Sequence, residues 1–512
     1  MNQNIATPKD AAAVVLLNET GDEVLWARRN PNLAFLGGWH AFPGGKLEAS
    51  DALVKVKNCE DAELERFIVC AAREMFEEVG VLLASGGEKL TRGQRASLHD
   101  DLISGRMTFA EILAHWNLWI DAADFFYTGF WTTPNFSPVR FKTRFFLAVC
   151  PLRQTPFAAI SELENVQFIA PHAALGRWRK SQVLISPPVL LTLKILEDIL
   201  TADLHGLTRI EKFGIENQNL KSVSAKLLKN SQAADGAISH IELNSRITCF
   251  PLKTATLPPA THTNCFVVGR KKFVVVDAAS GEEPEQNALH DLIDSLVERG
   301  YFCQAIITTH HHPDHFGGEV ALQKHLFDKF NLQIPLAAHQ TTAENLSGKV
   351  EFQKFLEDGE IFDLEDETGA NFQLKTLHTP GHAAGLVAFY DAEFGFLLAG
   401  DNVINSSSVV IAPPDGNLKD YLRSLERLKN LPNLRFLCGS HGSAVFDAKT
   451  KIESYIAHRI KREKQILAAM ENGATTVREI VETVYVDLKP ELVRLAEKSV
   501  EAHLEKIREE RS

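Results

Sequence analysis

Hydrophobic positions in the first 205 residues form short apolar runs interspersed with helical patterns. The runs AAAVVLLN and EVLWARR are separated by the turn sequence ETGD, which predicts a β-hairpin. The aromatic segments FFYTGFWTTP and KTRFFLAVCP are β-prone and predict two further strands. A helix is expected after Pro187 and Pro188, through VLLTLKILEDIL. The pattern therefore predicts an α/β domain over residues 1–205.

The pattern changes twice after residue 205. Residues 206–240 are polar and weakly periodic, which predicts a linker with a marginal helix. From residue 241 to about 450, helical segments alternate with short β runs, namely NCFVVG, KKFVVVDA, QAIITT, QIPLAAH, FQLKTLH, GLVAFY, FGFLLAG and LRFLCGS. This alternation predicts a second α/β domain over residues 241–450.

The last part of the chain, residues 451–512, is mostly helical in pattern. Thr476 and Glu479 form a capping box, which marks the start of a helix. Pro490 marks another start, because proline is favoured in the first turn. Apolar residues follow it at helical spacing, at Leu492, Leu495, Ala496, Val500, Leu504 and Ile507.

Composition narrows the class of protein. With 45% hydrophobic and 23% charged residues, the 512-residue chain is typical of a globular protein and not of a disordered or fibrous one. The net charge of −12 excludes a protein held to nucleic acid by its overall field. No apolar run reaches the ~18 residues of a membrane span, and the first residues lack a signal-peptide pattern. Seven cysteines without a C-x-x-C pair indicate reduced thiols, and we expect a cytoplasmic protein without membrane contact.

A cluster of potential metal ligands stands out in the second domain. The sequence HHHPDH at residues 310–315 directly follows the β run QAIITT. His382, Asp401 and His441 each come shortly after a later β run. Zinc sites need imidazoles and carboxylates that converge on a small volume, and loops that leave strands can supply them.

These motifs, H-x-H-x-D-H, then TPGH, GD and GSHG, resemble those of the metallo-β-lactamase-fold hydrolases. The resemblance implies an αββα sandwich that holds two Zn²⁺ ions, or Fe or Mn in their place. It also implies that Asp314 orients a dinuclear metal-bound hydroxide. By the same resemblance, one metal would be bound by His310, His312 and His382, and the other by Asp314, His315 and His441, with Asp401 bridging.

Spacing within the motifs distinguishes the branches of this family. True β-lactamases of this fold typically have Cys where Asp401 stands, and the interval from Asp401 to His441 is too short for the extra domain of the large RNA-processing members. The sequence after His441 resembles the β-lactamase-like protein 2 endoribonuclease branch, whose members end in a small winged-helix-like domain. This branch, over residues 241–512, implies a phosphodiester substrate such as single-stranded RNA. The alternative is a glyoxalase II-like thioesterase.

Basic residues that follow His441 suggest two interpretations: a platform for an anionic substrate, or a solvated helix face, which base rates favour. They are Lys449, Lys451, Arg459, Lys461, Arg462 and Lys464.

A second chemical motif lies in the first domain, in the sequence REMFEEVG at residues 73–80. Glu74, Glu77 and Glu78 are spaced i, i+3 and i+4, which places them on one face of a helix. Three carboxylates so placed repel one another unless a cation lies between them, and oxygen ligands suit Mg²⁺ or Mn²⁺. Gly80 lets the chain turn out of this helix.

Together with FPGG at residues 42–45, this motif resembles the Nudix box. Gly45 and Asp51 keep the first spacing, although Asp replaces Glu, and the interval from Asp51 to Arg73 is 14 residues longer than usual. A divided box of this kind resembles a CoA-diphosphatase-like subgroup, over residues 8–205. The resemblance implies an α/β/α fold, Mg²⁺ or Mn²⁺, and hydrolysis of a small nucleoside-diphosphate-linked substrate.

By the same resemblance, the three glutamates would bind the metal, Glu74 would also act as a base, and Arg73 would orient the carboxylates. An inactive Nudix scaffold is the alternative that the insertion leaves open.

The sequence thus predicts a bifunctional metal-dependent hydrolase: a Nudix domain, a metallo-β-lactamase-fold domain and a helical winged-helix-like end. The fusion suggests that the two activities serve one pathway, such as nucleotide or acyl-CoA clearance. Two non-catalytic alternatives remain. One domain would bind a ligand and regulate the other, or residues 451–512 would bind nucleic acid.

Overall fold

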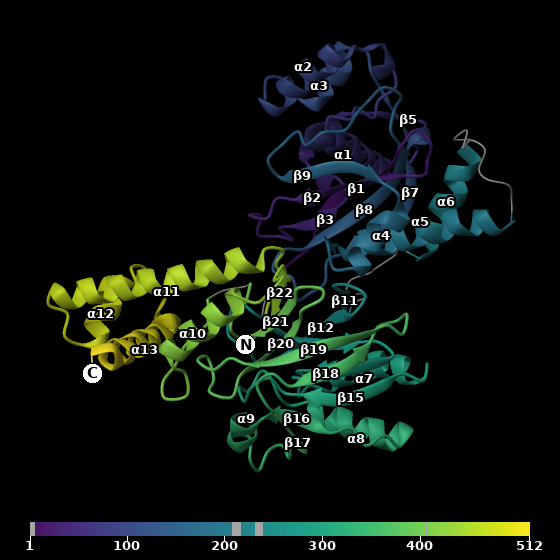
Figure 1. Ribbon diagram of the computed structural model, residues 1–512. Helices are drawn as coiled ribbons and strands as arrows, with labels where there is room; N and C mark the ends of the chain where they lie inside the picture. The colour runs from purple at the N-terminus through teal and green to yellow at the C-terminus, as the bar shows by residue number, and fades with distance from the viewer. Residues whose placement is uncertain (1–5, 207–216, 231–238, 406–407, 512) are drawn as a thin grey trace. The chain divides into compact units, whose positions relative to one another are not determined.

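The computed structural model describes residues 6–206, 217–230, 239–405 and 408–511 (Figure 1). They belong to two compact units, Met1–Ser239 and His240–Ser512. The predicted linker, residues 206–240, lies partly outside the described residues; its described part contains helix α6 (Asn217–Asn230). None of the helices described is both long and apolar enough to cross a membrane.

The first unit is built on an eight-stranded mixed sheet in the order β10–β3–β2–β1–β8–β7, with β4 beside β1 and β9 beside β2. The predicted hairpin is confirmed, because Leu17 at the end of β1 pairs with Val24 at the start of β2. The strands are β1 (Lys9–Leu17), β2 (Val24–Arg29), β3 (Trp39–Ala41), β4 (Gly44–Lys46), β7 (Phe126–Thr132), β8 (Phe141–Val149), β9 (Leu163–Ile169) and β10 (Leu184–Ile185).

Helices cover both faces of this sheet. Successive side chains of β1 point to opposite faces, so Val14 and Leu16 pack into the core on the α1 side, whereas Val15 and Leu17 pack against α4, α5 and α6. This two-sided burial explains why AAAVVLL reads as a continuous apolar run. The helices are α1 (Ala62–Val79), α2 (Arg92–Ile103), α3 (Phe109–His115), α4 (Pro171–Arg179) and α5 (Pro187–Gly206).

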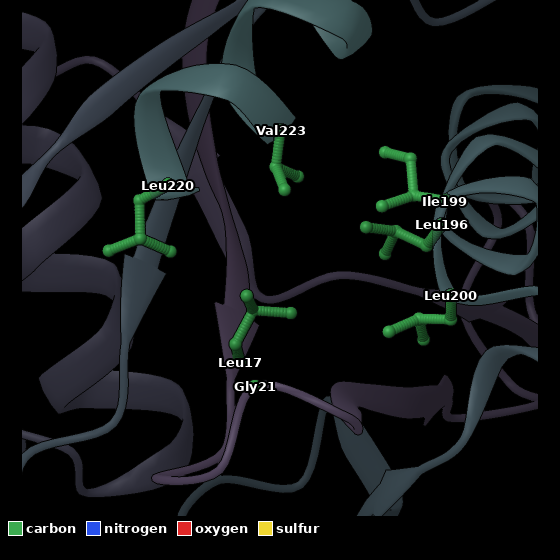
Figure 2. Close-up of a pocket in the computed structure, with 7 residues that line it drawn as sticks. All are labelled: Leu17, Gly21, Leu196, Ile199, Leu200, Leu220 and Val223. Carbon is green, nitrogen blue, oxygen red and sulfur yellow. The ribbon is translucent and has the colours of Figure 1, made fainter. Parts of the chain in front are cut away.

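A small apolar cavity lies between β1, α5 and α6 (Figure 2). Its volume is about 20 Å³, close to that of one water-sized probe. It is lined by Leu17, Gly21, Leu196, Ile199, Leu200, Leu220 and Val223. Since no polar side chain lines it, we interpret it as a packing void and not as a ligand site.

The second unit contains twelve strands joined in one branched sheet. Strand β14 is the branch point, since it pairs with β13, β15 and β18. The strands are β11 (Ile241–Glu242), β12 (Ile247–Lys253), β13 (His262–Gly269), β14 (Lys272–Val276), β15 (Phe302–Ile307), β16 (Leu336–His339), β17 (Lys354–Leu356), β18 (Ile361–Glu365), β19 (Asn371–His378), β20 (Val387–Asp391), β21 (Phe396–Gly400) and β22 (Phe436–Gly439). All eight predicted β runs are therefore strands.

Helices form an outer layer on each arm of the branched sheet (Figure 1). Helices α7 (Glu283–Val297) and α8 (Glu319–Phe330) pack on the arm that contains β14 and β15. Helices α10 (Leu418–Lys429) and α11 (Ala448–Glu471) pack on the arm that contains β20, β21 and β22. The short helix α9 (Gln340–Asn345) follows β16. The result is a sheet structure enclosed by helices on both sides.

The end of the chain is helical, as predicted. Helix α12 (Val477–Val484) begins with the Thr476–Glu479 capping box, and α13 (Val493–Arg511) follows. Pro490 begins a short 3₁₀ turn, Pro490–Leu492, so the α-helix itself starts three residues later than the proline. Helices α11, α12 and α13 share a small core that includes Ile466, Ile480 and Val500.

A close backbone contact fixes the loop after β19. Gly381 has φ 133°, and its carbonyl accepts a hydrogen bond of 2.9 Å from Asn417 N, just before α10. A Cβ atom at residue 381 would lie 2.2 Å from the backbone N of Tyr421. Only glycine allows this approach, so the glycine of the TPGH motif sets the position of His382 beside it.

We predict that Gly381→Ala destabilises the second unit by about 2–4 kcal/mol, because the methyl group meets backbone that cannot move aside. Denaturant unfolding followed by circular dichroism measures this change, and metal bound per chain reports the displacement of His382. Gly281→Ala is the matched control, since a Cβ there meets nothing within 4 Å. Equal stability of the two variants would contradict the prediction.

Candidate metal centres

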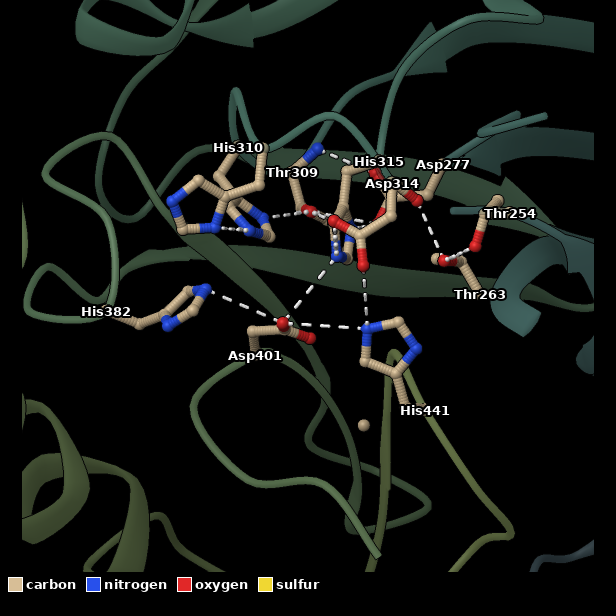
Figure 3. A network of polar contacts seen from close by, with 12 residues as sticks. Thr254, Thr263, Asp277, Thr309, His310, Asp314, His315, His382, Asp401 and His441 are labelled. Carbon is tan, nitrogen blue, oxygen red and sulfur yellow. Dashed lines mark hydrogen bonds and ion pairs between the residues drawn. The ribbon is translucent and has the colours of Figure 1, made fainter. Parts of the chain in front are cut away.

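The predicted metal ligands of the second unit all lie on loops that begin near the ends of strands. Residues 310–315 follow β15, and His382 follows β19. Asp401 comes directly after β21, and His441 shortly after β22. These four loops bring their side chains together around one centre (Figure 3).

Asp401 lies in the middle of this cluster. Its Oδ2 atom is 3.5 Å from His382 Nε2, 3.6 Å from His315 Nε2 and 3.6 Å from His441 Nε2. One carboxylate oxygen is thus shared among three imidazoles. This is the position in which a bridging ligand between two cations would lie.

Three sets of potential ligand atoms at this centre each lie within 4.8 Å of one another, and together they include all seven predicted residues. The sets are His310, His312 and His382; His310, His315 and Asp401; and Asp314, His315 and His441. In the first set, His310 Nε2 is 3.0 Å from His312 Nδ1. In the third, His441 Nε2 is 3.4 Å from Asp314 Oδ2. The structure therefore brings together residues up to 131 positions apart in the sequence.

For four of the histidines, the ring nitrogen that faces away from the centre contacts the surrounding protein. The contacts are His310 Nδ1 to Thr309 Oγ1 (3.1 Å), His315 Nδ1 to Asp277 Oδ2 (2.9 Å), His382 Nδ1 to Val410 O (2.8 Å) and His441 Nδ1 to His262 O (2.8 Å). Such contacts fix the orientation of each ring and leave Nε2 directed inward.

Asp277 is a site residue that the sequence analysis did not single out. It follows β14 directly, is buried, and accepts hydrogen bonds from the backbone N and the hydroxyl of Thr309 at 2.8 Å each. It therefore links the start of the histidine loop to His315. The signal was present in FVVVDAA, a charged residue directly after a buried strand, but only the fold shows which histidine it contacts.

Unsatisfied buried atoms test whether a cation fits this centre. Among the described side chains, His315 Nε2, His382 Nε2 and Asp401 Oδ1 are buried without a hydrogen-bond partner. Buried polar groups without partners are rare and costly in proteins. Here they converge on one volume with the chemistry of zinc ligands, so the residues present fit a metal centre.

Protonation differs between the two sides of the cluster. Burial lowers the pKa of His312 to about 3 and lowers the pKa values of His310 and His382, so these rings are neutral. Burial opposes the charged form of His441 and His315 too, but neighbouring carboxylates together outweigh it. Asp401 and Asp314 raise the pKa of His441 to about 10, and Asp401 and Asp277 raise the pKa of His315 well above its usual value. Without a cation, two imidazoliums balance the buried carboxylates.

In the first unit, helix α1 carries the predicted carboxylates Glu74, Glu77 and Glu78 on its last two turns. The helix begins after Asp61, whose side chain caps it, and ends at Gly80 with φ 67°, as the sequence predicted.

Arg73 lies at the centre of this motif and contacts several of its carboxylates. Its guanidinium contacts Asp51 through two hydrogen bonds of 2.8 and 3.1 Å, and both side chains are buried. It also donates to Glu74 Oε1 (2.8 Å), Glu77 Oε2 (3.0 Å) and Lys46 O (3.1 Å). Arg73 therefore orients the carboxylates and links the two halves of the divided motif.

The additional residues between Asp51 and Arg73 are accommodated without separating these two side chains. They form the end of a 3₁₀ turn (Ala49–Leu53), strand β5 (Val56–Lys57) and the first turns of α1, and β5 pairs with β6 (Ile120–Asp121). The Asp51–Arg73 pair is therefore intact despite the insertion.

The FPGG segment packs against the same helix. Gly44 N donates to Glu78 Oε2 at 2.8 Å, and a Cβ on Gly45 would lie 2.4 Å from Glu74 Oε1. Burial raises the pKa of Glu74 to about 7 and that of Glu78 to about 8. Within the described part of the chain, this motif contains no three ligand atoms within 4.8 Å of one another, and Arg73 Nη1 bridges Glu74 and Glu77.

Comparison with known families matches this architecture. The NUDIX domain model matches residues 7–187, the metallo-beta-lactamase superfamily model residues 258–441, and the beta-lactamase associated winged helix domain model residues 476–511. The chain contains a NUDIX domain joined to a metallo-β-lactamase-superfamily domain. The predicted domain order, Nudix, metallo-β-lactamase and winged helix, is confirmed. Both families bind divalent metal ions, whereas the identity of the ions and of the substrates is a separate question.

Individual relatives each match less than half of the chain. The beta-lactamase-like protein 2 homolog of Caenorhabditis elegans is 29% identical over 236 residues, which are 46% of this chain and 74% of that protein. An atrochrysone carboxyl ACP thioesterase of Pseudocercospora fijiensis is 26% identical over 233 residues, 44% of this chain and 62% of that protein. A solved NUDIX hydrolase of Alicyclobacillus acidocaldarius is 29% identical, with 38% of this chain and 92% of that one covered and a TM-score of 0.32.

The basic residues after the metallo-β-lactamase motifs do not act as one exposed platform. Arg459 is buried and donates to Val409 O. Arg462 donates to Val484 O at 3.1 Å and lies 4.0 Å from the centre of the Tyr485 ring. Both guanidiniums therefore hold α11 to neighbouring segments and belong to neither interpretation, whereas Lys449, Lys461 and Lys464 are exposed, as on a solvated helix face.

We predict that zinc binding to the metallo-β-lactamase domain at pH 7 releases about two protons, because His315 and His441 must lose their raised-pKa protons to become ligands. The observed affinity for zinc therefore increases as the pH rises, because fewer protons compete with zinc for the two imidazoles. Calorimetry in two buffers with different ionisation enthalpies measures the release, and His441→Asn should reduce it by about one proton. A pH-independent affinity would be inconsistent with this charge balance.

For the Nudix domain, we predict that Gly45→Ala lowers Mg²⁺-dependent hydrolysis by about 100-fold while leaving stability nearly unchanged. The new methyl group displaces only the end of the Glu74 side chain, which can rotate. Stability of this domain can be followed by tryptophan fluorescence, because all six tryptophans lie before residue 179. Gly93→Ala, where a Cβ meets open space, is the control. Full activity in Gly45→Ala would contradict a role for Glu74.

Proposed function

We propose that this chain is a bifunctional metal-dependent hydrolase with a separate metal centre in each catalytic domain. The observation that carries the proposal is the convergence of five histidines and two aspartates, with buried unsatisfied ligand atoms, in the second unit. We retain the division into residues 1–205, 206–240, 241–450 and 451–512 as part of this proposal. The seven free thiols fit a reducing compartment such as the cytoplasm.

In the metallo-β-lactamase domain, one cation would be bound on the His312 side of Asp401 and a second on the His441 side. The first would take His310, His312 and His382, the second Asp314, His315 and His441, and Asp401 would serve both. Zinc, iron or manganese suits these ligands, and such ions act as Lewis acids and lower the pKa of water.

Asp314 is the residue of this centre best placed to orient water. Its side chain is 17% exposed, whereas that of His315 beside it is fully buried. Its backbone carbonyl accepts a hydrogen bond of 2.7 Å from Thr263, which holds the loop in position. Although burial opposes it, the contact with His441 and the charge of His315 hold the pKa of Asp314 well below its usual range. The carboxylate therefore stays ionised and can orient water by accepting a hydrogen bond from it.

Two substrate classes are compatible with this domain. The similarity to an ACP thioesterase favours an acyl thioester, as in the glyoxalase II-like alternative. The similarity to a beta-lactamase-like protein 2 homolog, a branch that includes an endoribonuclease, favours a phosphodiester such as single-stranded RNA. The thioester is the better supported, because Arg459 and Arg462, two of the six basic residues that could bind an RNA backbone, are engaged within the fold.

In the Nudix domain, Glu74, Glu77 and Glu78 would bind Mg²⁺ or Mn²⁺, which neutralises the charge of a diphosphate. Glu74, with a pKa raised to about 7 by burial, can act as a base near neutral pH. Arg73 keeps the cluster oriented. A small nucleoside diphosphate derivative of the CoA type fits this chemistry. If the second domain releases CoA from a thioester, the product carries the diphosphate that the first domain cleaves.

A pair of variants tests both activities on one preparation. His310→Ala should lose hydrolysis of acyl-CoA thioester or single-stranded RNA by more than about 100-fold, yet keep Mg²⁺-dependent cleavage of CoA, ADP-sugars and dinucleotides. Glu77→Gln should show the converse, and the two parallel assays identify the substrate class of each domain.

Unchanged activity in either variant would refute the corresponding site. Fewer than one metal ion per chain in the purified protein, with His310→Ala changing nothing, would refute the second centre. Ligand binding without turnover in either domain would instead indicate a regulatory role.

A further inference from the structure

The orientation of His312 differs from that of the other histidines in the metallo-β-lactamase domain. His312 presents Nδ1 to the centre, 3.0 Å from His310 Nε2, so its outer nitrogen is Nε2. The other four present Nε2 and have Nδ1 in contact with the protein. The group that orients His312 must therefore contact Nε2, its outer nitrogen.

Asp415 is the acidic residue that faces this nitrogen. Its Oδ2 atom lies 3.8 Å from His312 Nε2 and 3.5 Å from His311 Nε2. Oδ1 of the same carboxylate accepts a hydrogen bond of 3.2 Å from Ala384 N, two residues after His382. Asp415 therefore bridges the histidine loop and the loop that carries another metal ligand.

The Oδ2 atom of Asp415 is buried and has no hydrogen-bond partner. A carboxylate oxygen left unsatisfied is costly, and the two ring nitrogens near it are His311 Nε2 at 3.5 Å and His312 Nε2, the one that belongs to a potential metal ligand, at 3.8 Å. A shift of about 1 Å brings Oδ2 and His312 Nε2 to normal hydrogen-bond distance. Asn345 Nδ2 faces His311 Nδ1 at 3.4 Å, so Nδ1 of His311 is an acceptor and its Nε2 also carries a hydrogen. The two lone pairs of Oδ2 can therefore accept from both rings, His311 on the outside and His312 on the metal side.

We propose that Asp415 is the positioning residue of His312: it accepts the hydrogen bond from Nε2–H, fixes the tautomer with Nδ1 unprotonated, and directs Nδ1 to the cation. This inference rests on the proposed metal centre. It gives all five histidines an oriented outer nitrogen. It also explains the acidic residue of the PPDG sequence, at residues 413–416, which the sequence motifs left without a role.

The test is Asp415→Asn in the full chain, with zinc affinity measured by competition against a chelator. Asn keeps an oxygen for Ala384 N but can present an amide N–H to His312. We expect one of the two ions to bind about 10–100-fold more weakly, with the other unchanged. In the cobalt-substituted protein, the visible absorption of one site should change. The matched control is Asp420→Asn on α10, an exposed aspartate that contacts Arg423.

Each outcome decides the proposal. Parental affinity for both ions in Asp415→Asn overturns it. Three ions in the parent and two in the variant also overturn it, because His311, His312 and Asp415 would then be ligands of a further ion. A parent that binds neither zinc, iron nor manganese refutes the proposed function itself, which distinguishes the two failures.

Stability of the metal-free variant separates positioning from folding. Equal thermal unfolding of metal-free Asp415→Asn and parent, with weaker zinc binding, supports positioning. If Asp415→Asn unfolds early, Asp415→Glu retains an acceptor: recovered zinc affinity supports the proposal, and failure to recover it overturns the proposal.

Discussion

The burial of the Asp401 carboxylate is the constraint on which the second unit depends. A buried charge is costly unless opposite charge or hydrogen bonds compensate it. Asp401 Oδ2 is shared by three imidazole nitrogens from three different loops. In the metal-free chain, protons on His315 and His441 supply the compensation, and a cation supplies it in their place. The loops therefore meet at one point because a charge must be balanced there.

In the first unit the charges are reversed: the positively charged side chain of Arg73 is buried among carboxylates. Arg73 is satisfied by Asp51, Glu74 and Glu77, and burial of both Arg73 and Asp51 makes their bidentate pair a fixed point of the fold. Removing either partner would leave a buried charge unpaired, which is far more costly than replacing both. This pair explains how the divided motif stays joined although 21 residues separate its halves.

In both units, the residues that would touch a metal are held by residues that would not. Asp277 and the carbonyls of Val410 and His262 orient imidazoles, and glycines allow backbone or carboxylates to approach closely. A Cβ is therefore less tolerated at Gly381 than at Gly45, because it would meet fixed backbone at Gly381 but only the end of a side chain at Gly45. The geometry of each centre is therefore set as much by its surroundings as by its ligands.

The sequence alone determined the class of each domain and 12 of the 22 strands described, because hydrophobic runs such as AAAVVLL and FVVV report burial directly. It also identified the seven potential ligands of one centre and the carboxylate helix of the other, since these motifs are local. It could not assign Asp277 or Asp415, because their importance lies in contacts with residues far away in the chain. It could not decide whether the inserted residues separate Asp51 from Arg73, or whether Arg459 and Arg462 face solvent. Those questions depend on packing between distant segments, which only the tertiary structure decides.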